Sequence, residues 1–245
     1  MNTIELNQYT EAWRNLGNTL PRPRAILAIS AHWYVNAMAV TAMSQPRTIH
    51  DFSGFPDELF SYQYNAPGSP HLAQQVIELL SPTPVIADES QWGLDHGTWS
   101  VLAHLYPDAD IPVVQLSINA SLPINEHLEI GRRLAPLCDE GILVMGSGNV
   151  VHNLSRINWA AGETGHDWAD RFDDHVAALM DTDPSKLMDA AAHPDWNLAV
   201  PTPEHFLPLA YIAGIATERK IPMSRFNYSR TLGSLSMTSY IARAI

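Results

Sequence analysis

The chain has 245 residues, of which 46% are hydrophobic and 16% charged, a balance typical of a globular protein that excludes a largely disordered one. Its formal net charge of −12 comes from 26 acidic and 14 basic residues. Such a surface repels phosphate backbones and anionic lipid, so we expect no nucleic-acid partner and no membrane partner. No apolar run approaches the roughly 20 residues that cross a bilayer, and the first residues lack the order of a signal peptide, so we expect a cytoplasmic location.

The cysteine and histidine content limits which side chains can bind a metal or transfer protons. Cys138 is the only cysteine, which excludes an intrachain disulfide and a thiolate metal cluster. The 11 histidines are therefore the obvious source of metal ligands and of proton-transfer groups near neutral pH.

Short apolar runs alternate along the chain with segments of helical spacing, without a repeat or a long linker. In chain order the predicted elements are a helix at 9–16, strands at 25–30 and 38–43, a helix at 71–80, a strand at 112–118, a helix at 125–137, a strand at 142–146, helices at 168–180 and 203–214, and further strand at 223–240. We expect the last of these at the edge of the sheet. The alternation predicts an α/β fold, with one domain over residues 1–245 and a mainly parallel or mixed central sheet flanked by helices.

Three histidines occupy positions that favour a metal site. His32 and His152 follow two of the apolar runs, and ligands of open α/β sheets gather beyond the carboxyl ends of strands. The glycines before His152 allow tight turns and close backbone approach. His205 is predicted in the first turn of a helix, where the positive end of the dipole favours the neutral imidazole that binds metal.

Two interpretations of these histidines stay open at this point. Any one of them taken alone is more often a hydrogen-bonded structural or surface residue, whereas two at strand ends and one at a helix start are harder to attribute to chance. Because they come from distant segments, no local ligand spacing decides between a metal site and three structural histidines.

Two further segments combine aromatic and polar residues. His96 lies in a glycine-flanked segment, where it can contact substrate or transfer a proton while Asp95 orients its ring. A turn capped by the aspartate, with a packed histidine, explains that segment equally well. Residues 50–56 are aromatic and contain a glycine, which suits a wall or lid over an apolar pocket, and surface packing explains them nearly as well.

Other enzyme chemistries lack their motifs. Residues 146–148 do not supply the G-x-S-x-G of a serine hydrolase, and no lysine follows a glycine as a phosphate-binding loop requires. Residues 145–148 lack the third glycine of the dinucleotide fingerprint. Cys138 lies in an ordinary helical stretch, which gives no support to a thiol nucleophile.

Distinctive segments cover nearly the whole chain, and they stand in one fixed order. They are SAHWY, IHDFSGFP, YNAPGSP, WGLDHGTW, YPDADIPVVQLSI, GSGNVVHNL, VPTPEHFLPL and GSLSM. In these segments the sequence resembles the DOPA dioxygenase family of class III extradiol ring-cleaving dioxygenases.

The resemblance implies a non-haem metal site that binds a catechol, DOPA or a similar compound, through its two hydroxyl oxygens and activates O₂ beside it. It implies that His32 and His205 are metal ligands. His152 is then either a further ligand or the acid/base that takes a catechol proton, and His96 is a catalytic residue that lines the substrate pocket. Imidazole suits iron and zinc, and a histidine suits proton transfer near neutral pH, so the residue types agree with these roles.

Ring opening with dioxygen needs a redox metal, so the resemblance implies iron(II) for catalysis. Zinc(II) has no redox chemistry and would fit an isolated or inactive form.

One motif of the family, His-Gly-Ser-Pro after an apolar strand, is absent here, although its histidine is a metal ligand. We expect the natural protein to begin further upstream, with a true truncation as the alternative. Three hypotheses follow: an extradiol dioxygenase, a metal-binding homologue that is catalytically impaired, and a non-catalytic binding module that keeps the aromatic pocket. The sequence favours no oligomeric state.

Overall fold

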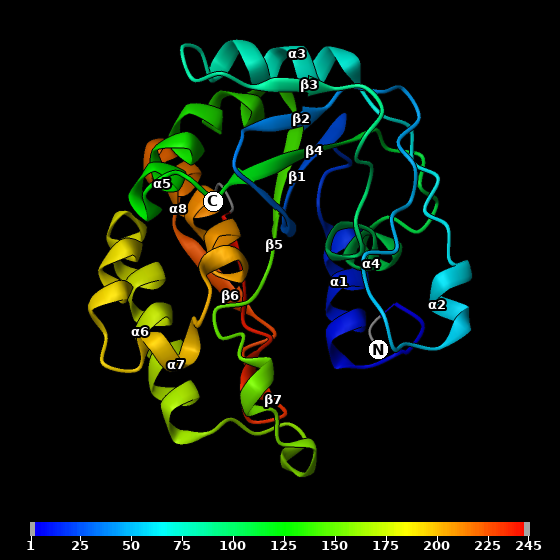
Figure 1. Ribbon diagram of the computed structural model, residues 1–245. Helices are drawn as coiled ribbons and strands as arrows, with labels where there is room; N and C mark the ends of the chain where they lie inside the picture. The colour runs from blue at the N-terminus through cyan, green and yellow to red at the C-terminus, as the bar shows by residue number, and fades with distance from the viewer. Residues whose placement is uncertain (1–2, 243–245) are drawn as a thin grey trace. The chain divides into compact units, whose positions relative to one another are not determined.

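The apolar run that starts at Ala25 forms strand β1 (Ala25–Val35), and its first seven residues are all buried. A strand this apolar is typical of a sheet covered on both faces. β1 lies between β4 (Val113–Asn119) and β5 (Ile142–Ser147), and both neighbours run parallel to it. The computed structural model, which describes residues 3–242, shows these strands within a five-stranded sheet (Figure 1).

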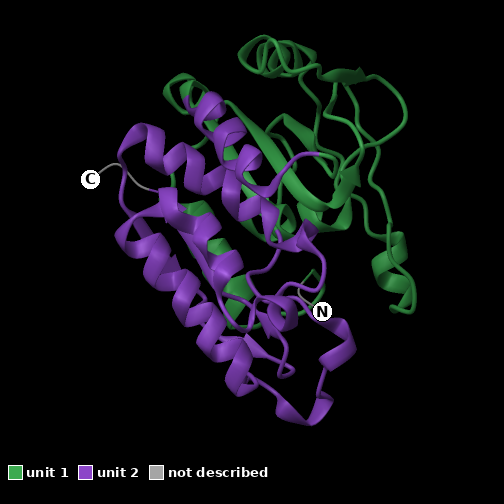
Figure 2. Ribbon diagram, turned by 60° about the vertical axis from the view of Figure 1, so that its left-hand side comes forward, with its two compact units in different colours: residues 1–121, 136–147 green, residues 122–135, 148–245 purple. Residues whose placement is uncertain are grey.

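The chain divides into two compact units, which Figure 2 colours separately. Unit 1 comprises residues 1–121 and 136–147, and unit 2 comprises residues 122–135 and 148–245. Each unit has a hydrophobic core of its own. A single catalytic domain over residues 1–245 stays a prediction.

Unit 1 contains the five-stranded sheet, in the order β3-β2-β4-β1-β5. β3 (Ile86–Asp88) pairs parallel to β2 (Ala39–Thr41), whereas β2 pairs antiparallel to β4. The sheet is therefore mixed and mainly parallel. The predicted α/β class is confirmed.

Three of the four α-helices described in unit 1 pack against this sheet or against one another. The four helices are α1 (Gln8–Thr19), α2 (Asp57–Ser61), α3 (Pro70–Leu79) and α4 (His96–Leu105). α1 begins where the Asn7 side chain accepts the backbone N–H groups of Tyr9 and Thr10. α4 packs against β1 and β5, α1 packs against α4, and α3 lies beside β2 and β3 (Figure 1). Trp99 of α4 is fully buried in the core, so this helix is firmly anchored.

Unit 2 combines helices, short strands and 3-10 segments. Among the described residues its α-helices and strands are α5 (Ile124–Leu134), α6 (Asp167–Thr182), α7 (Trp196–Ala199), α8 (Leu207–Arg219), β6 (Met223–Phe226), β7 (Arg230–Thr231), β8 (Leu235–Ser236) and β9 (Ser239–Ala242), and its longest 3-10 helix is η4 (Pro184–Ala192). α5 and α8 pack closely at two glycines. A Cβ on Gly131 would lie 2.2 Å from the Tyr211 carbonyl oxygen, and a Cβ on Gly214 would lie 2.1 Å from that of Leu128. This helix contact therefore requires glycine on both sides.

Two element predictions need correction. The strands within residues 223–240 exist, but their predicted place at the sheet edge is wrong, because β6 pairs with β9 and β7 with β8 in two separate two-stranded sheets. The helix predicted over residues 203–214 is divided. Pro203–His205 form a 3-10 turn, and α8 begins only at Leu207, with Pro208 in its first turn, where a missing N–H costs nothing.

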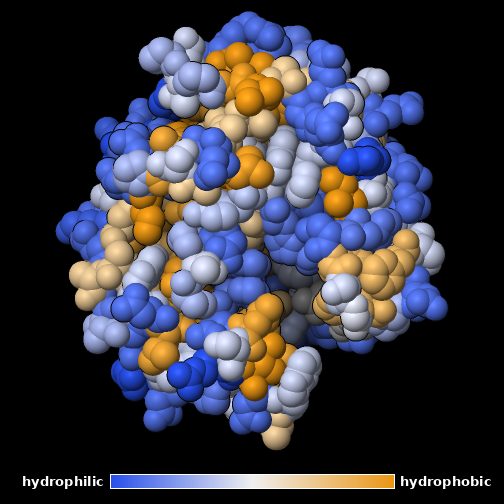
Figure 3. All heavy atoms as spheres, viewed as in Figure 1, coloured by the Kyte–Doolittle hydropathy of each residue, from blue (hydrophilic) through white to orange (hydrophobic). Residues whose placement is uncertain are grey.

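Within residues 3–242, no helix is both long and apolar enough to cross a bilayer. On the face shown in Figure 3, apolar side chains occur in small groups among polar ones. Phe55 and Phe60 are exposed but not isolated, because both rings contact the ring of Phe52.

Candidate functional site

His32 lies in an irregular part of strand β1. The pairing of β1 with β4 is regular up to Ile29 and resumes at Tyr34 with a shifted register. The pairing with β5 ends at Ser30. Irregularities of this kind bend a strand and redirect its side chains, so His32 is freed from the regular alternation of the sheet. The apolar run before His32 is buried as predicted, but the strand continues to Val35, so His32 lies within β1 and its predicted place beyond the end of the strand is wrong.

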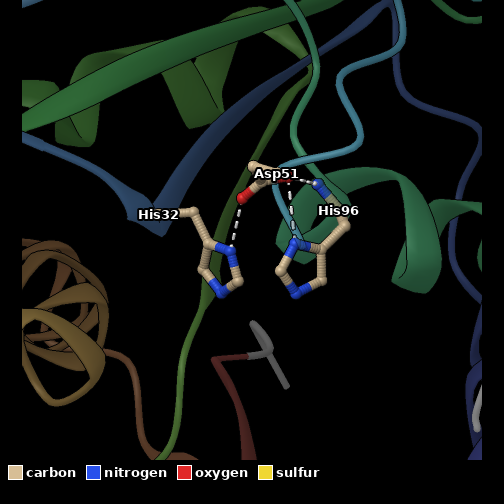
Figure 4. A group of neighbouring side chains, drawn as sticks. All are labelled: His32, Asp51 and His96. Carbon is tan, nitrogen blue, oxygen red and sulfur yellow. Dashed lines mark hydrogen bonds and ion pairs between the residues drawn. The ribbon is translucent and has the colours of Figure 1, made fainter. Parts of the chain in front are cut away.

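Asp51 brings His32 and His96 together (Figure 4). It lies on the loop between β2 and α2. The Nδ1 atom of His32 lies 2.7 Å from Asp51 Oδ2, and the Nδ1 atom of His96 lies 2.9 Å from Asp51 Oδ1. The backbone N–H of His96 also donates to Oδ1, at 2.9 Å. The centroids of the two imidazole rings are 3.8 Å apart, with an angle of 77° between the ring planes.

The charge of Asp51 is stabilised by these donors. Burial alone would raise the pKa of its carboxyl group, but hydrogen bonds from His32 and His96 outweigh burial and hold the pKa well below its usual range. Asp51 is therefore an acceptor-only carboxylate at neutral pH. The three side chains are 16% to 30% exposed, so solvent or a small ligand can reach them.

Of the two interpretations of Asp95, the capped turn is confirmed, and the orientation of the His96 ring by Asp95 is wrong. Its side chain accepts the backbone N–H of Thr98 at 3.0 Å, which caps the start of α4, and it also contacts the Gln115 amide. Asp95 is fully buried and fixes the helix end that carries His96. The carboxylate that orients the His96 ring is Asp51 instead.

The predicted aromatic segment, residues 50–56, lies beside His96. The Phe52 ring stands edge-on to the His96 ring, with centroids 5.2 Å apart. The Phe55 ring stands edge-on to Phe52, with centroids 5.3 Å apart, and is 44% exposed. Both of the interpretations offered for this segment, pocket wall and packing, agree with these contacts.

Unit 2 brings His152 and His205 together. Their rings stack in parallel, with centroids 3.5 Å apart and an angle of 5° between the planes. The backbone N–H of His152 donates to the carbonyl oxygen of Ala199 at 2.9 Å. Gly148 lets the preceding loop approach His205, because a Cβ there would lie 2.2 Å from the His205 carbonyl oxygen. The predicted need for a glycine before His152 is thus confirmed at Gly148.

A carboxylate also accompanies this second pair. The Nδ1 atom of His205 lies 3.2 Å from Glu204 Oε1, which also accepts the Thr202 hydroxyl at 2.7 Å. Burial alone would raise the pKa of Glu204, but hydrogen bonds from His205 and Thr202 lower it to about 2. His205 lies in the 3-10 turn before α8, not in the first turn of that helix, which corrects its predicted position.

The chemistry of the unit 1 group suits a metal ion. Within residues 3–242, the ligand atoms of His32, Asp51 and His96 all lie within 4.8 Å of one another. Imidazole is a good ligand for iron and zinc, and metal-bound histidines commonly donate their other ring nitrogen to a carboxylate. Sequence reasoning missed Asp51, although it lies in the same quoted segment as Phe52 and next to His50. An acidic residue inside an aromatic loop was the available signal.

The chain is similar to a known protein family and to named proteins over most of its length. Residues 2–237 match the family described as the catalytic LigB subunit of aromatic ring-opening dioxygenase. The chain is 49% identical over 243 residues to a 4,5-DOPA dioxygenase extradiol of Escherichia coli K12, which covers 98% of this chain and 89% of that protein. It is 38% identical over 215 residues to the 4,5-DOPA dioxygenase extradiol of Beta vulgaris, which covers 86% of this chain and 80% of that one.

The fold has a counterpart among solved structures. A crystal structure of an uncharacterized protein of Escherichia coli K12 superimposes with a TM-score of 0.85 and 44% sequence identity. The match covers 98% of this chain and 94% of that chain.

Proposed function

Because the chain belongs to the family of the catalytic LigB subunit of aromatic ring-opening dioxygenases, we propose that it is a metal-dependent extradiol enzyme that opens the ring of a catechol. DOPA or a close analogue is the proposed substrate, since the relatives that share most of the chain are named for that compound. The carbon–carbon bond that breaks lies beside the diol. Both atoms of O₂ enter the product, a ring-opened semialdehyde, and O₂ is the oxidant, so no further reductant is needed.

The observation that carries this proposal is the imidazole group His32–His96, held by one charged carboxylate. We assign His32, His152 and His205 as metal ligands. Iron(II), when bound, would supply the coordination of the catechol oxygens and the redox chemistry with O₂, while zinc(II) would occupy the same ligands without turnover.

The remaining roles belong to side chains that move protons or orient substrate. In the alternative role for His152, its imidazole accepts a proton from a catechol hydroxyl, which a histidine can do near neutral pH. We propose that His96 lines the substrate pocket, because its ring contacts the aromatic side chain of Phe52. The acidic surface supports the expectation that neither nucleic acid nor membrane is a partner, and we propose a cytoplasmic location.

The test is O₂ uptake by the protein loaded anaerobically with iron(II) and then mixed with L-DOPA in air. We expect uptake and a yellow ring-opened product. His152→Ala should lower the rate by about 100-fold or more, the range reported for loss of general acid–base groups. His71→Ala, at an exposed position on α3, is the matched control and should keep the wild-type rate.

Two results would contradict the proposal in different ways. Zinc or iron binding without any O₂ uptake would favour the catalytically impaired homologue. Full activity in His152→Ala would remove His152 from the site.

A further inference from the structure

A carboxylate that touches two imidazoles can act at a metal centre in two ways. It can bind the metal together with both rings, or it can hold both rings so that their other nitrogens face the ligand. The distances around Asp51 distinguish these arrangements.

The contacts of Asp51 have the lengths of hydrogen bonds. Ligand atoms at about 2.0 to 2.2 Å from a tetrahedral metal lie roughly 3.3 Å or more from one another. The His32 Nδ1 atom is only 2.7 Å from one Asp51 oxygen, and the His96 Nδ1 atom is 2.9 Å from the other. Such spacing is too short for shared coordination. The His32 contact is a hydrogen bond, whereas the buried Nδ1 atom of His96 meets the carboxylate at an ion-pair distance without the alignment of a hydrogen bond. A charged carboxylate at either distance favours a proton on the Nδ1 atom that faces it.

The position of the second ring nitrogen follows from this. A neutral imidazole that carries its proton on Nδ1 has its lone pair on Nε2. Figure 4 shows the Nε2 atoms of His32 and His96 on the sides of the rings away from Asp51, turned in the same direction. The lone pairs of both rings therefore lie on the ring edges away from Asp51.

We propose that Asp51 is a positioning residue and not a metal ligand, and that it holds both His32 and His96 in the Nδ1–H tautomer. One carboxylate thereby sets the metal-binding imidazole and the substrate-facing imidazole at once. The roles of the two histidines in this inference rest on the proposed function, whereas their tautomers do not.

The substitution Asp51→Asn changes the two imidazole contacts in different ways. It keeps the shape of the side chain but offers one acceptor oxygen and one NH₂ donor. The ring that faces the NH₂ group must accept at Nδ1 and carry its proton on Nε2. That ring loses the lone pair that the wild-type carboxylate gives it.

The experiment compares wild type with Asp51→Asn and with Asp57→Asn, which changes an exposed aspartate of α2 in the same unit. The first measurement is the ¹⁵N NMR spectrum of the imidazoles in the metal-free protein. We expect both His32 and His96 as Nδ1–H tautomers in wild type and in Asp57→Asn, and at least one of them as the Nε2–H tautomer in Asp51→Asn.

The second measurement is zinc affinity by competition with a chromophoric chelator. Where the altered ring is His32, Asp51→Asn should weaken zinc binding by about 10- to 100-fold, the usual effect of losing a partner of a metal-bound histidine. Where it is His96, zinc affinity should stay near wild type and kcat for L-DOPA should fall. Asp57→Asn should change neither quantity.

The wild-type spectrum tests the predicted tautomers of His32 and His96 even if the Asp51→Asn variant does not fold. An Nε2–H tautomer at either ring in wild type, or an unchanged spectrum in a folded Asp51→Asn, would overturn the inference. Nδ1–H tautomers in a protein that neither binds zinc nor consumes O₂ would leave Asp51 its positioning role and refute the proposed function instead.

Discussion

The two units each bring two imidazoles together, but they do so by different means. In unit 1 a single carboxylate, Asp51, contacts the Nδ1 atoms of both His32 and His96. In unit 2 the rings of His152 and His205 stack face to face, and the carboxylate of Glu204 contacts His205 at a longer distance, 3.2 Å.

The difference shows that histidine side chains are constrained in two different ways. A carboxylate shared by two rings fixes a tautomer in each of them. Stacking fixes the plane of a ring but not the position of its proton. Unit 1 thus controls where a lone pair points, while unit 2 fixes the planes of two imidazoles.

The largest expected effect is the loss of zinc affinity when a proposed metal ligand is removed, because removal of a supporting carboxylate should cost less. His205→Ala should weaken zinc binding by more than about 100-fold, beyond the range expected for loss of a supporting carboxylate. Zinc affinity by chelator competition measures this effect, with circular dichroism to verify the fold. His175→Ala, which changes a half-exposed histidine of α6 in the same unit, is the control and should bind zinc like wild type. Zinc affinity within threefold of wild type in His205→Ala would mean that the stacked pair holds no metal.

Buried ionisable groups extend the comparison to stability. Unlike Asp51, whose charge is stabilised, His127 in unit 2 is fully buried, and burial lowers its pKa to about 4. Its Nδ1 atom lies 2.9 Å from the Tyr211 hydroxyl. Because the unfolded chain takes up a proton near pH 6.5 and the folded chain does so only near pH 4, this group destabilises the fold as the pH falls through that window. The expected loss is roughly 2 kcal/mol between pH 7 and pH 5.

A matched variant isolates this loss from that of other groups. Burial raises the pKa of Asp173 to about 6, so this carboxyl group acts with the opposite sign and favours the fold as the pH falls below 6. His127→Gln removes only the histidine contribution. Urea unfolding at pH 7 and pH 5 should therefore show a smaller loss of stability, or a gain, in the variant relative to wild type. Equal pH dependence in the two proteins would contradict the assigned cause.

The sequence pointed to the histidines, but it did not reveal the strand irregularity and the carboxylate that orient them. The apolar runs before His32 and His152 were predictable from the sequence, because strand hydrophobicity is a local property of the chain. The irregular pairing between Ile29 and Tyr34 depends on the partner strand, so no pattern within β1 could reveal it. Asp51 is 19 residues from His32 along the chain, and no local spacing links the two.

The same limit explains the errors in the fold. The strand propensity of residues 223–240 was readable, but the choice of partner was not, because pairing is set by tertiary contacts. The adjacency of Asp95 and His96 in sequence left two interpretations open, a carboxylate that orients the ring and a capped turn. The Asp95 side chain satisfies the N–H groups at the start of α4, a demand that every helix makes.

The smallest expected effect gives the sharpest contrast between the two carboxylates. Glu204 contacts one imidazole at 3.2 Å and also accepts the Thr202 hydroxyl, so it holds the His205 ring less tightly than Asp51 holds His32. Glu204→Gln keeps an acceptor oxygen for the single ring it serves. We therefore expect zinc affinity to fall by no more than about threefold, against about 10- to 100-fold when a supporting partner is lost outright.

Chelator competition on Glu204→Gln beside Asp51→Asn measures both effects under one set of conditions. Where Asp51→Asn alters the tautomer of His32, a loss of zinc affinity in Glu204→Gln as large as that in Asp51→Asn would mean that the carboxylates are equivalent, and that sharing one acceptor between two rings gives no special control. A small loss would mean that an amide suffices where one imidazole needs one acceptor. An amide fails only where a single side chain must accept protons from two imidazole rings. The geometry around Asp51 creates that situation.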